Sequence, residues 1–132
     1  MNDIHARIYK NLIAALGRGD DPHQWPDAWK LEREPYQPLH VDVLERTAEH
    51  VTIALAHYYE QNGDLVPDPD MQVRLFPQQK MAEALTFQNS LVYTEVYPII
   101  DGKRMVRLNA KVDLNKFLEG WVRNIRRQFG QP

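Results

Sequence analysis

The apolar residues near the N-terminus are spaced four apart, as they are on one stripe of a helix. The stripe contains Ile4, Ile8, Leu12 and Leu16. Asn2 and Asp3 are residue types that cap the start of a helix, and Gly17 followed by Gly19 favours its end. This pattern predicts an amphipathic N-terminal helix that needs a surface to pack on.

From residue 39 onward the apolar period changes from four to two, which is typical of strands. Six segments follow this pattern: residues 39–44, 51–59, 71–75, 84–88, 91–97 and 105–108. The links between them are short, and one of them contains the turn pair Asp101-Gly102. Consecutive strands joined by short links predict a single, largely antiparallel sheet of about six strands.

A helical period returns near the C-terminus, with apolar residues three and four apart. They are Leu114, Phe117, Leu118, Trp121, Val122, Ile125 and Phe129. Asp113 is the expected N-cap and Gly130 the expected end. Each helix has one apolar stripe, so the expected fold class is α+β, with the N-terminal and C-terminal helices packed on one face of the sheet.

The segment of residues 18–38 carries four prolines and two tryptophans. Asp21 and Asp27, which stand beside prolines, predict one short helical turn at residues 28–31. Trp25 and Trp29 are expected to hold the segment against the body of the protein. Residues 1–132 are therefore predicted to form a single α+β domain, which a length of 132 residues suits.

The composition limits both the cellular compartment and the kinds of reactive site that are expected for this protein. The chain has no cysteine, which excludes disulfides, thiolate metal sites and thiol catalysis. Its apolar runs are a few residues long, whereas a membrane helix needs roughly 18, and the N-terminus lacks the apolar segment of a signal peptide. A cytoplasmic protein with no membrane partner is expected.

The net charge of −2 hides an asymmetry along the chain. Residues 1–100 contain 8 basic and 15 acidic side chains, whereas residues 101–132 contain 8 basic and 3 acidic ones. A basic surface with Tyr93 and Tyr97 nearby in the sequence has the residue types that track and stack a nucleic acid. The pI of about 6.2 and the lack of an established motif favour a solvated helix face instead, so nucleic acid is not expected as a partner.

Residues 57–71, HYYEQNGDLVPDPDM, concentrate aromatic, acidic and turn-forming residues between two predicted strands. Asp64, Asp68 and Asp70, with His57 upstream, supply side chains that coordinate Mg²⁺ or Ca²⁺ in other proteins. Their spacing differs from that of the EF-hand loop, and Asp and Pro also favour turns for reasons of their own. Turn chemistry is the favoured interpretation, and no metal or other cofactor is expected.

Few catalytic motifs are available. His57, at the end of a predicted strand, is a candidate general acid or base, but it shares a strand face with apolar residues, where a lone histidine is more often a core or rim residue. Ser90 is the only serine and lies outside any G-x-S-x-G pattern. The patterns G-x-x-x-x-G-K-[ST] and G-x-G-x-x-G are also absent from the sequence, which argues against a nucleoside triphosphatase.

Three stretches, HYYEQNGDLVPDPDM, ALTFQNSLVYTEVYP and FLEGWVRNIRRQFG, resemble a family of short bacterial and phage- or plasmid-borne proteins known only as a domain of unknown function. The likeness spans residues 39–129 and leaves the first helix and the Trp-Pro segment outside. It implies a small α+β domain and assigns no activity. It also implies that one set of residues acts together: Tyr58, Asn62, Gly63, Asp64, Asp68, Pro69, Gln88 and Asn89.

A physical reason for this grouping lies in two predicted turns. Asn62-Gly63 supplies the positive-φ positions of a tight turn, in which Asp64 is expected to accept backbone N–H bonds, as is Asn89 in the next turn. The candidate binding cluster comprises His57, Tyr58, Asn62, Asp64, Asp68, Asp70, Gln88 and Asn89. It either pins neighbouring loops at one sheet edge, which is favoured, or lines a shallow ligand groove.

The sequence thus favours a non-enzymatic binding or interaction module that self-associates as a small homo-oligomer, such as a homodimer, and binds a protein or a small ligand. The alternative is a metal-assisted hydrolase of a phosphoester that uses His57, Asp64, Asp68 and Asp70. The hydrolase requires carboxylates that converge in a concave pocket, whereas the module requires an exposed apolar or aromatic patch.

Overall fold

The computed structural model describes residues 3–130, in which two long helices, a 3₁₀ turn and eight strands are formed. The elements are α1 (Ile4–Leu16), η1 (Pro22–Gln24), β1 (Ala28–Leu31), β2 (Leu39–Arg46), β3 (Val51–Gln61), β4 (Asp64–Phe76), β5 (Met81–Gln88), β6 (Tyr93–Glu95), β7 (Ile99–Ile100), β8 (Lys103–Arg104) and α2 (Leu108–Phe129). Asn2, one of the two predicted caps, lies outside the described residues.

Helix α1 begins and ends where the sequence predicts. The side chain of Asp3 accepts a hydrogen bond of 2.9 Å from the backbone N–H of His5, which satisfies one of the free donors at the start of the helix. Gly17 ends the helix in the left-handed conformation, with a φ of 67°. In the apolar stripe of α1, Ile8, Leu12 and Leu16 are buried in the core, and Ile4 packs against the core while partly buried.

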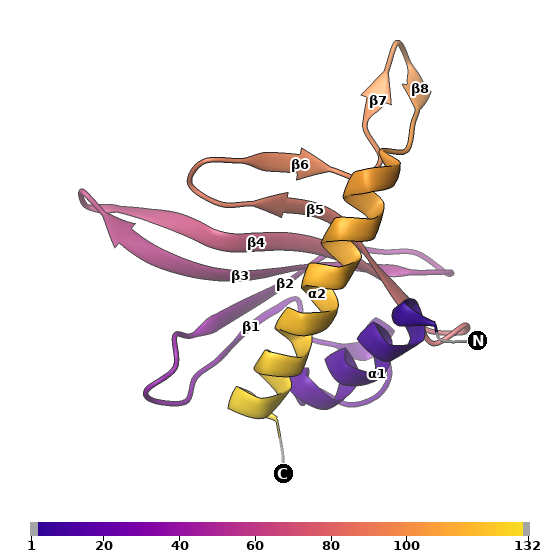
Figure 1. The fold of residues 1–132 in the computed structure, drawn as a ribbon. Coiled ribbons are helices and arrows are strands. Elements are labelled where there is room, and N and C mark those ends of the chain that lie inside the picture. The colour runs from indigo at the N-terminus through magenta and orange to yellow at the C-terminus, as the bar shows by residue number, and fades with distance from the viewer. Residues whose placement is uncertain (1–2, 131–132) are drawn as a thin grey trace.

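Strands β1 to β6 form one antiparallel sheet in the order in which they occur in the chain. Both helices lie on the same face of this sheet: α1 packs against α2, and both helices contact β5 (Figure 1). The apolar residues of β2 to β5 alternate, so that one of the two faces is buried under the helices. The α+β fold predicted from the sequence is confirmed.

The prediction of a helical turn at residues 28–31 is wrong, because these residues form the edge strand β1. Backbone pairing with β2 sets Trp29 opposite Val41 and outweighs the local helical signals. The short helical turn lies earlier, at η1, where the side chain of Asp21 caps the backbone N–H of His23. Trp25 is buried and donates to the carbonyl oxygen of Gly19 at 3.1 Å, so this tryptophan holds the segment against the body as expected.

The prediction of a strand at residues 105–108 is also wrong. Asp101 and Gly102, with φ values of 53° and 76°, form the turn between β7 and β8, which make a separate two-stranded sheet. Helix α2 already begins at Leu108, with Arg107 as N-cap, and the predicted cap Asp113 lies inside the helix. Strand pairing in this region is therefore limited to the two residues of β7 and the two residues of β8, and the chain is helical from Leu108 onward.

A buried asparagine attaches α2 to the sheet. The side-chain oxygen of Asn115 accepts a hydrogen bond of 2.9 Å from the backbone N–H of Ala84 on β5. Its amide nitrogen donates to the carbonyl oxygen of Lys111, one helical turn earlier, at 2.7 Å. The first bond ties α2 to β5 at this point of the helix, and the second holds the Asn115 side chain in the orientation that the first bond needs. None of the helices within residues 3–130 combines the length and the hydrophobicity that crossing a lipid bilayer requires.

Candidate functional site

The stretch of residues 57–71 forms the outer part of a long hairpin rather than a loop. It consists of the end of β3, a two-residue turn and the first half of β4. Asn62 and Gly63 have φ values of 55° and 86°, which confirms the predicted positive-φ turn. No described residue donates a hydrogen bond to the side chain of Asp64, in contrast to the expectation for this turn.

His57 and Tyr58 belong to different surroundings. The Nδ1 atom of His57 lies 2.8 Å from the carbonyl oxygen of Pro38, and its ring lies 5.7 Å from that of Trp121 on α2. The ring of Tyr58 instead packs edge to face against His40 at 5.0 Å. Successive side chains of a strand point to opposite faces, so His57 is on the helix-covered side and Tyr58 on the uncovered side.

The aspartates are spread along β4. Asp64 pairs with Gln61 beside the turn, whereas Asp70 pairs with Ala56. Six residues of a strand cover about 20 Å, so these two carboxylates lie far apart. Among residues 3–130 no group of three or more histidine, aspartate or glutamate side chains is placed to hold one metal ion. The metal-assisted hydrolase remains an untested prediction.

Part of the candidate cluster does meet on the uncovered sheet face. Asp70 stands directly opposite Gln88 on β5, and burial together with the nearby charge of Asp42 raises the pKa of the Asp70 carboxyl. Burial, Asp70 and Asp42 also raise the pKa of Tyr58. The side-chain oxygen of Asn89 instead accepts hydrogen bonds from the backbone N–H groups of Leu91 and Val92 in the next turn, both at 2.9 Å. The ligand-binding role of these residues stays a prediction.

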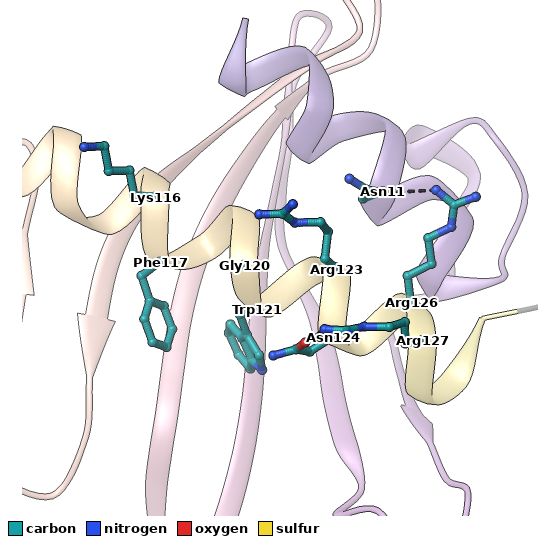
Figure 2. A pocket seen from close by; sticks show the side chains of 9 residues that line it. All are labelled: Asn11, Lys116, Phe117, Gly120, Trp121, Arg123, Asn124, Arg126 and Arg127. Atoms are coloured by element: carbon teal, nitrogen blue, oxygen red, sulfur yellow. Dashed lines mark hydrogen bonds between the residues drawn. The ribbon is translucent and has the colours of Figure 1, made fainter.

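A concave surface that the sequence did not single out lies along the exposed side of α2. We call it the cationic groove; it has a volume of about 800 Å³. Its lining residues are Asn11 from α1 and Lys116, Phe117, Gly120, Trp121, Arg123, Asn124, Arg126 and Arg127 from α2 (Figure 2). Four of these nine side chains are basic and none is acidic.

The charges of the four basic residues in the groove are not neutralised by ion pairs with carboxylates of the described residues. Within residues 3–130, none of the four forms an ion pair with a carboxylate. Arg126 donates to the side-chain oxygen of Asn11 at 2.9 Å, and Arg127 donates to that of Asn124 (Figure 2). Neutral amides thus orient two guanidinium groups without cancelling their charge. Glu119 on the same helix is bound to Arg7 of α1 and does not line the groove.

Aromatic rings form one edge of the cationic groove. Phe117 packs edge to face against Phe87 of β5 at 5.3 Å, and its ring lies 6.1 Å from that of Trp121. Phe117 keeps 44% of its surface exposed, whereas Trp121 keeps only 9%. The contact of Trp121 with His57 joins this edge to the stretch that the sequence singled out.

Gly120 opens the middle of the groove. A Cβ atom added there meets no heavy atom within 4 Å, so packing inside the domain does not require glycine. Glycine in a helix interior costs about 1 kcal/mol relative to alanine. This glycine amid the basic residues of a long helix was not singled out from the sequence, and the interpretation of the basic residues as a solvated helix face stays untested.

A comparison with protein families matches residues 7–130 to "Domain of unknown function (DUF6908)". The match reaches into α1 and the Trp-Pro segment, both of which the sequence resemblance had left outside. Comparisons with curated proteins and with solved structures give no match. The match covers nearly the whole chain and agrees with the resemblance carried by its motifs, so the protein belongs to the DUF6908 family, a domain of unknown function.

Proposed function

We propose that this domain is a non-enzymatic binding module that holds an anionic partner in the cationic groove along α2. The observation that supports the proposal is the set of four cations around Gly120, which have no carboxylate partner among residues 3–130 and line a concavity of about 800 Å³. A binding module needs shape and charge of this kind but no converging catalytic groups.

The groove suits carboxylate or phosphate groups for two physical reasons. Three of its four cations are arginines, whose planar guanidinium groups form paired hydrogen bonds to such anions. Arg126 and Arg127 are also oriented in advance by Asn11 and Asn124, which lowers the entropy lost when they bind. Several cations in one concavity further attract an anion over about 8 Å at physiological salt.

Fluorescence anisotropy with a labelled oligo-glutamate peptide tests this function at low and at physiological salt. We expect binding that weakens as the salt concentration rises. The double variant Arg123→Glu/Arg127→Glu reverses two charges of the groove and should weaken binding by at least about tenfold.

The matched control is Lys10→Glu/Lys80→Glu, which changes the net charge equally at exposed positions that do not line the groove. This control should retain most of the affinity. The proposal fails if the unmodified domain does not bind the peptide at low salt, or if both double variants weaken binding equally, since charge alone would then explain it.

A further inference from the structure

We infer that the partner is a protein segment with an acidic part and an apolar part, which lies along α2. This inference rests on the proposed function of the cationic groove. The reason is that the exposed side of α2 continues beyond the groove. Leu108 and Val112 precede Lys116 at steps of four, and Arg123 and Arg127 follow it at steps of seven and four, so all five lie on one stripe of the helix.

The first part of this stripe is apolar and uncovered. Leu108 is 69% exposed and Val112 is 52% exposed. The β7–β8 hairpin projects beyond the main sheet beside the start of α2 (Figure 1). Its residues Ile99 and Ile100 are exposed as well, as are Met105 and Val106 on the way to the helix. Exposed apolar residues that gather around basic ones are typical of a protein-binding surface.

Charge and chemistry decide between the possible occupants. A second copy of the chain whose two-fold axis passes through the groove would set the four cations against the same four cations, and a copy shifted along α2 would set them against apolar residues that offer no counter-charge. A nucleic acid would pair its phosphates with the cations but would leave Leu108 and Val112 uncovered. It would also find one exposed stacking ring, Phe117, because Trp121 is only 9% exposed. A peptide with acidic and apolar side chains satisfies both halves of the stripe.

The dimensions fit a short linear segment. Leu108 and Arg127 lie 19 positions apart on α2. At 1.5 Å per residue this is a length of about 28 Å. An extended peptide of about nine residues covers that length. Gly120, which has no Cβ atom, lets such a chain approach the helix backbone in the middle of the cationic groove.

Three labelled probes of similar length test the inference by fluorescence anisotropy. One peptide combines glutamates with a block of leucines, the second contains the same number of glutamates among glycines and serines, and the third probe is single-stranded oligo-thymidine. The combined peptide is expected to bind about tenfold more tightly than the second peptide, because it also buries apolar surface.

The variant Leu108→Gln/Val112→Gln should remove this gain and leave the binding of the second peptide unchanged. The control Leu65→Gln/Leu91→Gln changes two apolar residues that are at least as exposed but lie outside α2, and it should keep the gain. The melting temperature of every variant is measured first, and binding is compared at a temperature at which all variants are folded, so that unfolding does not imitate a loss of affinity.

Two results would overturn the inference and leave the proposed function standing. The first is that the combined peptide binds no more tightly than the second peptide, or that its advantage survives in Leu108→Gln/Val112→Gln. The second is that oligo-thymidine binds more tightly than the combined peptide. By contrast, if Arg123→Glu/Arg127→Glu leaves the binding of the second peptide intact, the proposed function itself fails.

Discussion

Under the proposed function, Gly120 serves the binding surface at the expense of its helix. It lies in the middle of the 22 residues of α2, where its neighbours leave ample room for a side chain. Conformational freedom of the backbone in the unfolded chain makes glycine unfavourable at such a position. Packing inside the described domain does not require a glycine at this position, and the proposed partner of the groove gives it a role.

Gly120→Ala is therefore expected to stabilise the free domain by about 0.5–1 kcal/mol, measured as the free energy of unfolding in urea. Gly130→Ala is a useful contrast, because a Cβ atom at Gly130 would lie 2.6 Å from the carbonyl oxygen of Arg126 and should destabilise the domain. A loss of stability in Gly120→Ala would mean that the helix needs glycine there for an internal reason.

Asp70 gives a prediction about pH. Burial, followed by the charge of Asp42, raises the pKa of Asp70 above its ordinary value of 3.8. Between that value and the raised pKa the folded state binds more protons than the unfolded state, so the free energy of unfolding decreases as the pH rises through this window. Asp70→Asn removes the titrating carboxyl and with it this decrease.

We expect Asp70→Asn to unfold at a higher urea concentration than the unmodified domain at neutral pH, and to differ less from it below pH 3.8. Asp64→Asn, at the exposed tip of the β3–β4 hairpin, is the control for the loss of one negative charge. An advantage of Asp70→Asn that is the same at both pH values would contradict the assigned cause.

Among the elements, α2 combines a core role with a surface role. Trp121 lies on the border between the two: it packs against His57 and Phe117, and one edge of its ring lines the cationic groove. Trp121→Ala should lower the free energy of unfolding by about 3–5 kcal/mol, the usual cost of truncating a buried aromatic residue. Phe117→Ala, at a position that is 44% exposed, should cost clearly less. An unchanged denaturant midpoint in Trp121→Ala would show that α2 is not part of the core.

The elements that the sequence predicts best are those in which local and global signals agree. Both helix stripes, the alternating strands and the Asn62-Gly63 turn were predictable, because residue periodicity and turn chemistry act within a few residues. Residues 28–31 and 105–108 were not, because pairing with β2 and the early start of α2 depend on neighbours distant in the sequence. The concave shape of the cationic groove was not predictable for a similar reason: sequence shows which residues are basic, but not that Glu119 pairs with Arg7 rather than with the cations of α2.

For the whole molecule, the charge asymmetry of the chain becomes an asymmetry of surfaces. The cationic groove lies on α2, whereas Asp42 and Asp70 lie on the uncovered sheet face. A two-fold axis through the cationic groove would set its cations against one another, and the self-association expected from the sequence stays a prediction.

The separation of Asp64 from Asp70 gives a prediction about metals. Thermal unfolding with and without Mg²⁺, Mn²⁺ or Ca²⁺ should give the same melting temperature, since only an ion that binds the folded state raises its stability. Asp68→Asn provides the control for specific binding by this stretch. A reproducible rise in melting temperature that Asp68→Asn abolishes would favour the metal-assisted hydrolase instead.

The hydrogen bond from the backbone N–H of Ala84 to the side chain of Asn115 makes this amide a probe of the attachment of α2 to β5. This amide can exchange its hydrogen for deuterium only when α2 has moved away from β5, so its protection measures the free energy of that local opening. The cationic groove is assembled from α2 and Asn11, and therefore exists only while the helix is attached. An anionic partner in the groove should slow the exchange of the Ala84 amide by the factor by which it stabilises the attached state, so deuterium uptake at β5 reports the occupancy of α2.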